Sequence, residues 1–187
     1  MRISTPRRRP ILSIVGNSGV IPEHQRTLAF ELGRRAVEAG FRIACGGRDG
    51  VMEAAAQGAH AAVNYQNGDT VGIGPSYGHE DQNPWIDVVI PTGLGFARNM
   101  VVVSTGHVVV AIGGGPGTLS EIALAWQIGR PVLALQGAEG WAEHLADSGA
   151  PGQGPVPIEL FSDSGALLDR ARSLAATVAP QHVSVGR

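Results

Sequence analysis

The 187-residue sequence contains no lysine, and all 14 of its basic residues are arginines. A pyridoxal phosphate enzyme needs a lysine to hold its cofactor as a Schiff base, and a Walker A loop needs one to reach the β and γ phosphates. The sequence therefore excludes both classes of protein.

Cysteine and long apolar runs are also scarce. Cys45 is the only cysteine, so no disulfide forms within the chain, and the six histidines show no metal-ligand spacing. Ser104, Gly106 and His107 interrupt the longest valine-rich stretch, which stays below the roughly 18 apolar residues of a membrane span. No segment has the pattern of a signal peptide. We expect a cytoplasmic protein with no bound metal and no membrane contact.

Positive and negative charges nearly balance each other, with 14 basic and 16 acidic residues and a formal net charge of −2. Such a chain has little global field for steering nucleic acid, so nucleic acid is not the expected partner. The basic cluster lies at the amino terminus, interrupted by prolines, and comprises Arg2, Arg7, Arg8 and Arg9. A solvated arm over residues 1–10 is expected, although contact with nucleic acid or a partner is the alternative. The domain then spans 11–180, with a tail over 181–187.

The order of apolar segments predicts an α/β fold. Short runs rich in β-branched residues predict strands at Ile11–Val15, Arg42–Cys45, Thr70–Ile73, Asp87–Ile90, His107–Ile112 and Pro131–Leu135. Segments of helical period predict helices at Pro22–Ala39, Val51–Ala62, Thr118–Ile128, Trp141–Ala146 and Gly165–Val178, with a surface loop over Ser148–Pro157. Alternation of strands and helices predicts a single doubly wound, Rossmann-like domain with a mainly parallel sheet.

The segment Phe96–Ser104 is ambiguous by local pattern. Its three consecutive valines favour a strand, because β-branched side chains are stiff in a helix. A helix is nevertheless the simpler connection between two parallel strands. We therefore predict a helix here.

Three glycine-bearing turns follow predicted strands: 16–19, 46–50 and 113–118. They should lie on one rim of the sheet, where backbone N–H groups and helix N-termini can hold an anion such as a phosphate. The alternative is that tight strand-to-helix turns need glycine anyway. The predicted ligand-binding residues are Gly16, Ser18, Gly46, Gly47, Gly114, Gly115, Gly117 and Thr118. The first turn lacks G-x-G-x-x-G and the second strand lacks a ribose-binding acid, so no dinucleotide cofactor is expected.

Two charged residues near these turns have two interpretations each. Glu121 could complete a capping box with Thr118, or it could act on a phosphoribosyl group bound at the turn. Arg98 could be a solvated residue at a helix start, or it could hold a phosphate through its guanidinium. The residues alone leave the role of Glu121 open and favour the solvated role for Arg98.

The segment Gly114–Glu121 resembles the P-G-G-x-G-T-x-x-E motif of the Lonely Guy (LOG) family, formerly misannotated as lysine decarboxylases. Arg98 stands where that family carries an arginine, and the glycine turn at 46–52 is also similar. The resemblance covers roughly Ile11–Leu135. It implies a homo-oligomer, dimeric or larger, that cleaves nucleoside 5′-monophosphates into free base and ribose 5-phosphate. Arg98 and Glu121 would then be catalytic, with no cofactor.

Departures from the motif point to a second function. Gly113 occupies the family's proline position, Asn99 replaces a lysine, and Ser120 replaces a frequent second acid. The sequence is similar to a sister branch that includes molybdenum cofactor carriers, which need the anion site without the hydrolysis. The alternative to a phosphoribohydrolase is therefore a non-catalytic carrier or sensor of a phosphorylated ligand, nucleotide or pterin.

Overall fold

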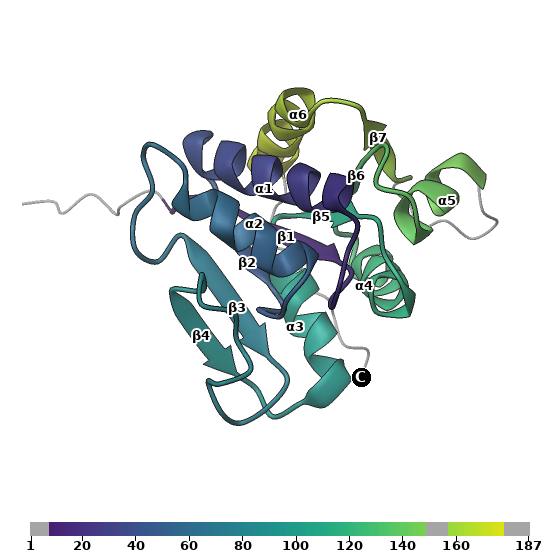
Figure 1. Cartoon of the computed structure of the whole chain (residues 1–187). Coiled ribbons are helices and arrows are strands. Elements are labelled where there is room, and N and C mark those ends of the chain that lie inside the picture. Colours follow the sequence, from purple (N-terminus) through teal and green to yellow (C-terminus); the bar gives the residue numbers. More distant parts are fainter. Residues whose placement is uncertain (1–7, 149–156, 178–187) are drawn as a thin grey trace, which may run out of the picture.

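The computed structural model describes residues 8–148 and 157–177, which form an α/β domain around one seven-stranded sheet (Figure 1). The strand order is β4-β3-β2-β1-β5-β6-β7, and every neighbouring pair is parallel. The strands are β1 (Ile11–Gly16), β2 (Arg42–Cys45), β3 (Thr70–Gly74), β4 (Val88–Pro91), β5 (Val108–Ile112), β6 (Val132–Leu135) and β7 (Glu159–Phe161). The predicted fold class is confirmed.

The helices form a layer on each face of the sheet (Figure 1). One face carries α1 (Glu23–Glu38), α2 (Val51–His60) and α6 (Ser164–Thr177), whereas the other carries α3 (Arg98–Thr105), α4 (Pro116–Gln127) and α5 (Trp141–Ser148). Strand β5, next to the central strand β1, is buried along its whole length, which explains its run of β-branched residues. Within the described ranges, no helix combines the length and apolarity needed to cross a membrane.

The ambiguous valine-rich segment is helical, as predicted. A 3-10 turn, η1 (Gly95–Ala97), precedes α3, so the α-helix begins at Arg98 rather than at Phe96. Val102 and Val103 are fully buried against the sheet. The requirement to cross from β4 to the parallel strand β5 therefore outweighs the local preference of valine for strands.

The sequence pattern did not predict β7, which is only three residues long and pairs with β6 at the sheet edge. So short a segment shows no detectable periodicity. Most of the predicted loop at Ser148–Pro157, the last residue of the final predicted helix and the predicted tail lie outside the described residues.

Arg9 departs from the predicted solvated arm. Its guanidinium donates to the buried carboxylate of Asp69 at 2.5 Å and to the carbonyls of Gly40 and Phe41. These bonds tie the chain just before β1 to the residues just before β2 and β3. Sequence composition could not reveal this ion pair because its partners are 60 residues apart. Residues 1–7 of the predicted arm lie outside the described part.

The carboxyl ends of the strands share one edge of the sheet. The chain leaves β1 toward β2, whereas it leaves the adjacent strand β5 toward β6, in the opposite direction along the sheet. In doubly wound sheets, such a switch point opens a crevice beyond the strand ends. All three glycine turns begin at this edge, since they follow β1, β2 and β5.

Candidate functional site

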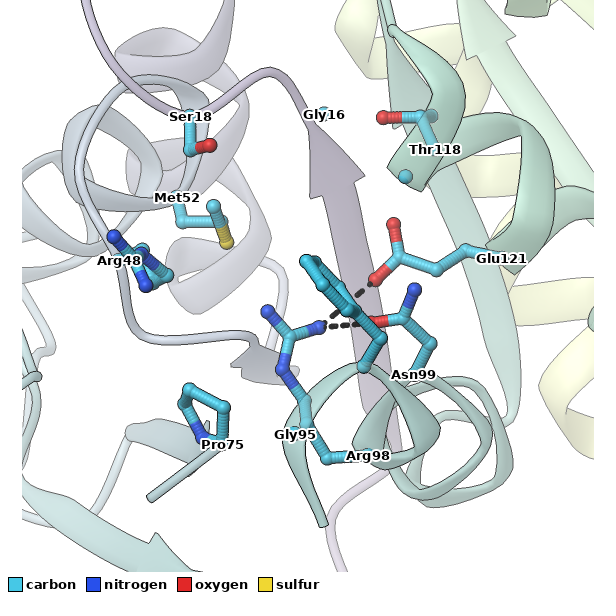
Figure 2. A pocket seen from close by; sticks show the side chains of 12 residues that line it. Gly16, Ser18, Arg48, Met52, Pro75, Gly95, Arg98, Asn99, Thr118 and Glu121 are labelled. Atoms are coloured by element: carbon cyan, nitrogen blue, oxygen red, sulfur yellow. Dashed lines mark hydrogen bonds and ion pairs between the residues drawn. The ribbon is translucent and has the colours of Figure 1, made fainter. Parts of the chain in front are cut away.

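A cavity of about 410 Å³ lies at this edge of the sheet (Figure 2). Its lining includes a set of predicted site residues, namely Gly16, Ser18, Arg98, Gly117, Thr118 and Glu121. It also includes residues that were not predicted, namely Arg48, Met52, Pro75, Gly95, Phe96 and Asn99. The fold thus brings together side chains and turns that follow β1, β2, β3, β4 and β5.

The other predicted glycines do not line the cavity but shape its surroundings. Gly114 has φ +120°, and its carbonyl accepts a hydrogen bond from the N–H of Trp141. Gly115 is the N-cap residue of α4. Gly47 has φ +69°, which favours glycine in the second turn. Their predicted contact with a ligand stays a prediction.

Gly46 has a specific steric role behind the cavity. A Cβ atom at this position would lie 2.5 Å from Nη2 of Arg98 and 3.0 Å from Sδ of Met52. Only glycine leaves room for the buried guanidinium at this point. The second glycine turn therefore serves the site by admitting the Arg98 side chain.

Arg98 and Glu121 form a buried ion pair at the floor of the cavity (Figure 2). Nη1 of Arg98 lies 3.4 Å from Oε1 of Glu121, and only 9% of Arg98 and 6% of Glu121 is exposed. The same nitrogen donates to Oδ1 of Asn99. Arg98 is therefore not a solvated residue at a helix start, because α3 turns it toward α4 and into the cavity.

Glu121 does not form the capping box that the sequence allowed. Helix α4 begins at Pro116 with Gly115 as its N-cap, and no side chain caps it. Thr118 thus lies inside the helix, where its backbone N–H is no longer at the cap position. The carboxylate faces Arg98 instead (Figure 2). Helix α4 begins two residues earlier than predicted, and this earlier start excludes the capping box as the role of Glu121.

Burial raises the pKa of Glu121 from 4.5 to about 7, although the charge and hydrogen bond of Arg98 lower it in part. Desolvation outweighs the ion pair because the carboxylate exchanges water for a single long hydrogen bond. The site therefore holds a carboxyl group that gains and loses its proton near neutral pH.

Asn99 and Ser120, the two motif departures on α3 and α4, contact each other. Nδ2 of Asn99 donates to Oγ of Ser120 at 2.8 Å, and this hydroxyl donates to the carbonyl of Gly117 at 2.7 Å. An uncharged bridge thus runs from Arg98 to the third glycine turn. The two substitutions form one structural unit, and they leave Glu121 as the acid in the cavity lining.

The cavity lining favours an anion. Arg48 and Arg98 both line the cavity, and the guanidinium of Arg98 lies beside the carboxylate of Glu121 (Figure 2). The start of α4 adds the N–H groups of Gly117 and Thr118, which have no acceptor within the helix. When Glu121 is protonated, two cations face no compensating charge in the lining. The sequence analysis did not name Arg48 as a site residue. Its position within the second glycine turn was the signal that could have identified it.

In the described part of the chain, no group of three or more histidine, cysteine, aspartate or glutamate side chains could hold a metal ion. Cys45, the last residue of β2, is buried, and burial raises the pKa of its thiol to about 11. A thiol that stays protonated at neutral pH is a poor nucleophile and a poor metal ligand. The charged groups that the cavity lining offers to a ligand are therefore Arg48, Arg98 and the carboxyl group of Glu121.

Known proteins resemble this chain over most of its length. The SLOG cluster4 family matches residues 9–154. An uncharacterized protein of Archaeoglobus fulgidus is 34% identical over 125 residues, which are 67% of this chain and 79% of that protein. The molybdenum cofactor binding protein of Rippkaea orientalis is 32% identical, with a TM-score of 0.77 and coverage of 90% of this chain and 99% of that one.

A second solved structure leads to the same group. The molybdenum cofactor carrier protein of Chlamydomonas reinhardtii is 32% identical, with a TM-score of 0.74 and coverage of 90% and 99% of the two chains. These matches confirm the predicted resemblance to the LOG-like branch that includes molybdenum cofactor carriers.

Proposed function

This chain belongs to the SLOG cluster4 family, and from that premise we propose that it carries a phosphorylated pterin, with molybdenum cofactor as its cargo. The phosphate would bind at the carboxyl edge of the sheet, between the arginines and the start of α4. This reverses the preference from the sequence, which placed hydrolysis of nucleotides first. Resemblance to cofactor-binding proteins over nearly their whole length supports the change.

One observation carries the proposal: a cavity of about 410 Å³ combines Arg48, Arg98 and the free N–H groups of Gly117 and Thr118. Guanidinium groups bind phosphate through charge-assisted hydrogen bonds, and a helix N-terminus adds aligned donors. The volume lies within the range of pockets for small ligands. A carrier needs these features and no further chemistry.

The test is to purify the protein from cells that make molybdenum cofactor and to look for bound pterin. We expect mass spectrometry of the denatured protein to detect a pterin in near-stoichiometric amount and intact after long incubation. Arg48→Ala is the matched variant, because Arg48 is exposed and its loss should spare the fold. Purification without pterin, in cells where a known carrier retains it, would contradict the proposal.

Glu121 favours a second candidate function, hydrolysis of nucleoside 5′-monophosphates. A carboxyl group with a pKa of about 7 can donate and accept a proton at neutral pH. Cleavage of an N-glycosidic bond passes through a centre of oxocarbenium character, which such a group can assist. Arg98 would hold the substrate close to it. On this alternative, Arg98 and Glu121 are the catalytic residues.

A panel of AMP, GMP, CMP and N6-substituted AMP tests the alternative. Chromatography would reveal free base and ribose 5-phosphate, and Glu121→Ala is the control. Release by the wild type, but not by the variant, would establish hydrolysis. Equal base release from both proteins, or none from either, would eliminate it and leave the carrier function.

A further inference from the structure

Phe96 combines two properties that rarely occur together. It lines the cavity, yet 92% of the residue is exposed to solvent. At the floor of the same cavity, Arg98 and Glu121 are at most 9% exposed. A ligand whose phosphate reaches the floor from solvent must therefore leave its remaining atoms near the exposed residues of the lining, including Phe96.

The backbone holds Phe96 in this position. Two glycines with positive φ precede it, Gly93 at +65° and Gly95 at +55°. The N–H of Gly93 donates to the carbonyl of Ser76, and that of Gly95 donates to Pro75. Phe96 therefore follows a turn whose backbone is hydrogen-bonded to the segment after β3. A backbone that is already held in this way needs little further ordering when a ligand packs against the residue.

We infer that Phe96 forms a stacking subsite for the planar heteroaromatic ring of the ligand, while the arginines hold its phosphate. The inference rests on the proposed binding of a phosphorylated ligand at this site. An aromatic face offers a planar ring dispersion and stacking contacts that do not depend on its hydrogen-bonding pattern. Met52, whose thioether is soft and polarizable, adds an apolar surface to the lining.

A second copy of the chain is the competing occupant for an exposed phenylalanine. The ligand ring is favoured because Phe96 belongs to the lining of a cavity with a polar, cationic floor. Pockets for small molecules typically combine apolar or aromatic walls with a few placed polar groups. Tyr77 provides a useful contrast, since it is 87% exposed but is not part of the cavity lining.

Calorimetric titration with GMP and with ribose 5-phosphate tests the subsite. Both compounds carry the same phosphate, but only GMP carries a planar ring, whose aminopyrimidinone part is shared with pterins. We expect the wild type to bind GMP on the order of tenfold more tightly than ribose 5-phosphate. Phe96→Ala should abolish that preference and leave the affinity for ribose 5-phosphate within about twofold.

Two further variants complete the design. Phe96→Trp should retain the preference for GMP, because tryptophan also stacks, and Tyr77→Ala should behave as the wild type. Repeating the titrations in the Glu121→Gln background keeps the comparison valid if the protein cleaves GMP. Sedimentation of each variant reports whether the loss of an aromatic side chain changes the number of subunits.

The outcomes separate the two proposals. Equal binding of both compounds by the wild type, or an unchanged preference in Phe96→Ala, would overturn the stacking subsite and leave phosphate binding intact. Failure of both compounds to bind would overturn phosphate binding and the subsite with it. Dissociation of Phe96→Ala into smaller species with an unchanged preference for GMP would assign Phe96 to a subunit interface and overturn the subsite.

Discussion

Replacing Glu121 by glutamine should change how the stability of the protein depends on pH. In the folded state burial raises the pKa of this carboxyl group to about 7, compared with 4.5 for the exposed group. The folded protein therefore binds the proton more tightly than the unfolded chain does. Stability from this group is fully present below pH 4.5 and is lost as the pH rises through 7.

The magnitude follows from the two pKa values. A difference of about 2.5 corresponds to a loss of about 3 kcal/mol once the pH is well above 7. Glutamine carries no charge at any pH, so the Glu121→Gln variant does not suffer this loss. We expect its stability relative to the wild type to increase by about 2 kcal/mol between pH 5.5 and pH 8. A difference in packing between the two side chains does not depend on pH, so it shifts the stability difference between variant and wild type by the same amount at every pH.

Urea denaturation of both proteins at a series of pH values measures this difference. Other titrating groups are common to the two proteins and cancel in the comparison. Glu23→Gln is the matched control, because it makes the same substitution at a side chain that is 84% exposed and lies outside the cavity lining. A stability difference that stays constant from pH 5.5 to 8, or that shrinks with rising pH, would refute the assignment of a buried, proton-binding carboxyl group.

The remaining predictions concern the cavity and the loop beside it. Arg48→Ala should weaken the binding of inorganic phosphate or GMP on the order of tenfold by calorimetry, and an unchanged affinity would remove Arg48 from the site. Gly46→Ala should reduce the same affinity, since its Cβ would displace the guanidinium of Arg98; crystals of the variant with that side chain unmoved would contradict this. Gln82→Met should raise the free energy of unfolding by about 1 kcal/mol, because both amide atoms of Gln82 are buried without partners in the described chain. A lower urea midpoint for this variant would show that the amide is satisfied in solution.

Much of the secondary structure followed from local pattern. The apolar runs located six of the seven strands, and helical periodicity located α1, α2, α4, α5 and α6 to within a few residues. These predictions succeed because burial of a strand or a helix face leaves a period in the sequence itself. β7 escaped detection because it has only three residues. The glycine turns were placed on one edge because all parallel strands end there.

The candidate site was only partly visible in the sequence. Arg98 and Glu121 were identified through their motif, and glycine turns indicated an anion. The ion pair between them, the raised pKa of Glu121 and the exposure of Phe96 were not predictable, because each depends on how distant segments pack. The capping box fitted the spacing of Thr118 and Glu121 equally well, and only the true start of α4 excluded it.

The sequence by itself determined most of the strands and helices, the parallel sheet and the edge at which the three glycine turns meet. These properties follow from hydrophobic periodicity and glycine conformation, which act over a few neighbouring residues. The tertiary structure alone decided that Arg48 joins Arg98 in one cavity, that Glu121 is buried there and that Arg9 pairs with Asp69. Electrostatics and solvent exposure depend on distances through space, and the folded chain fixes those distances between residues far apart in sequence.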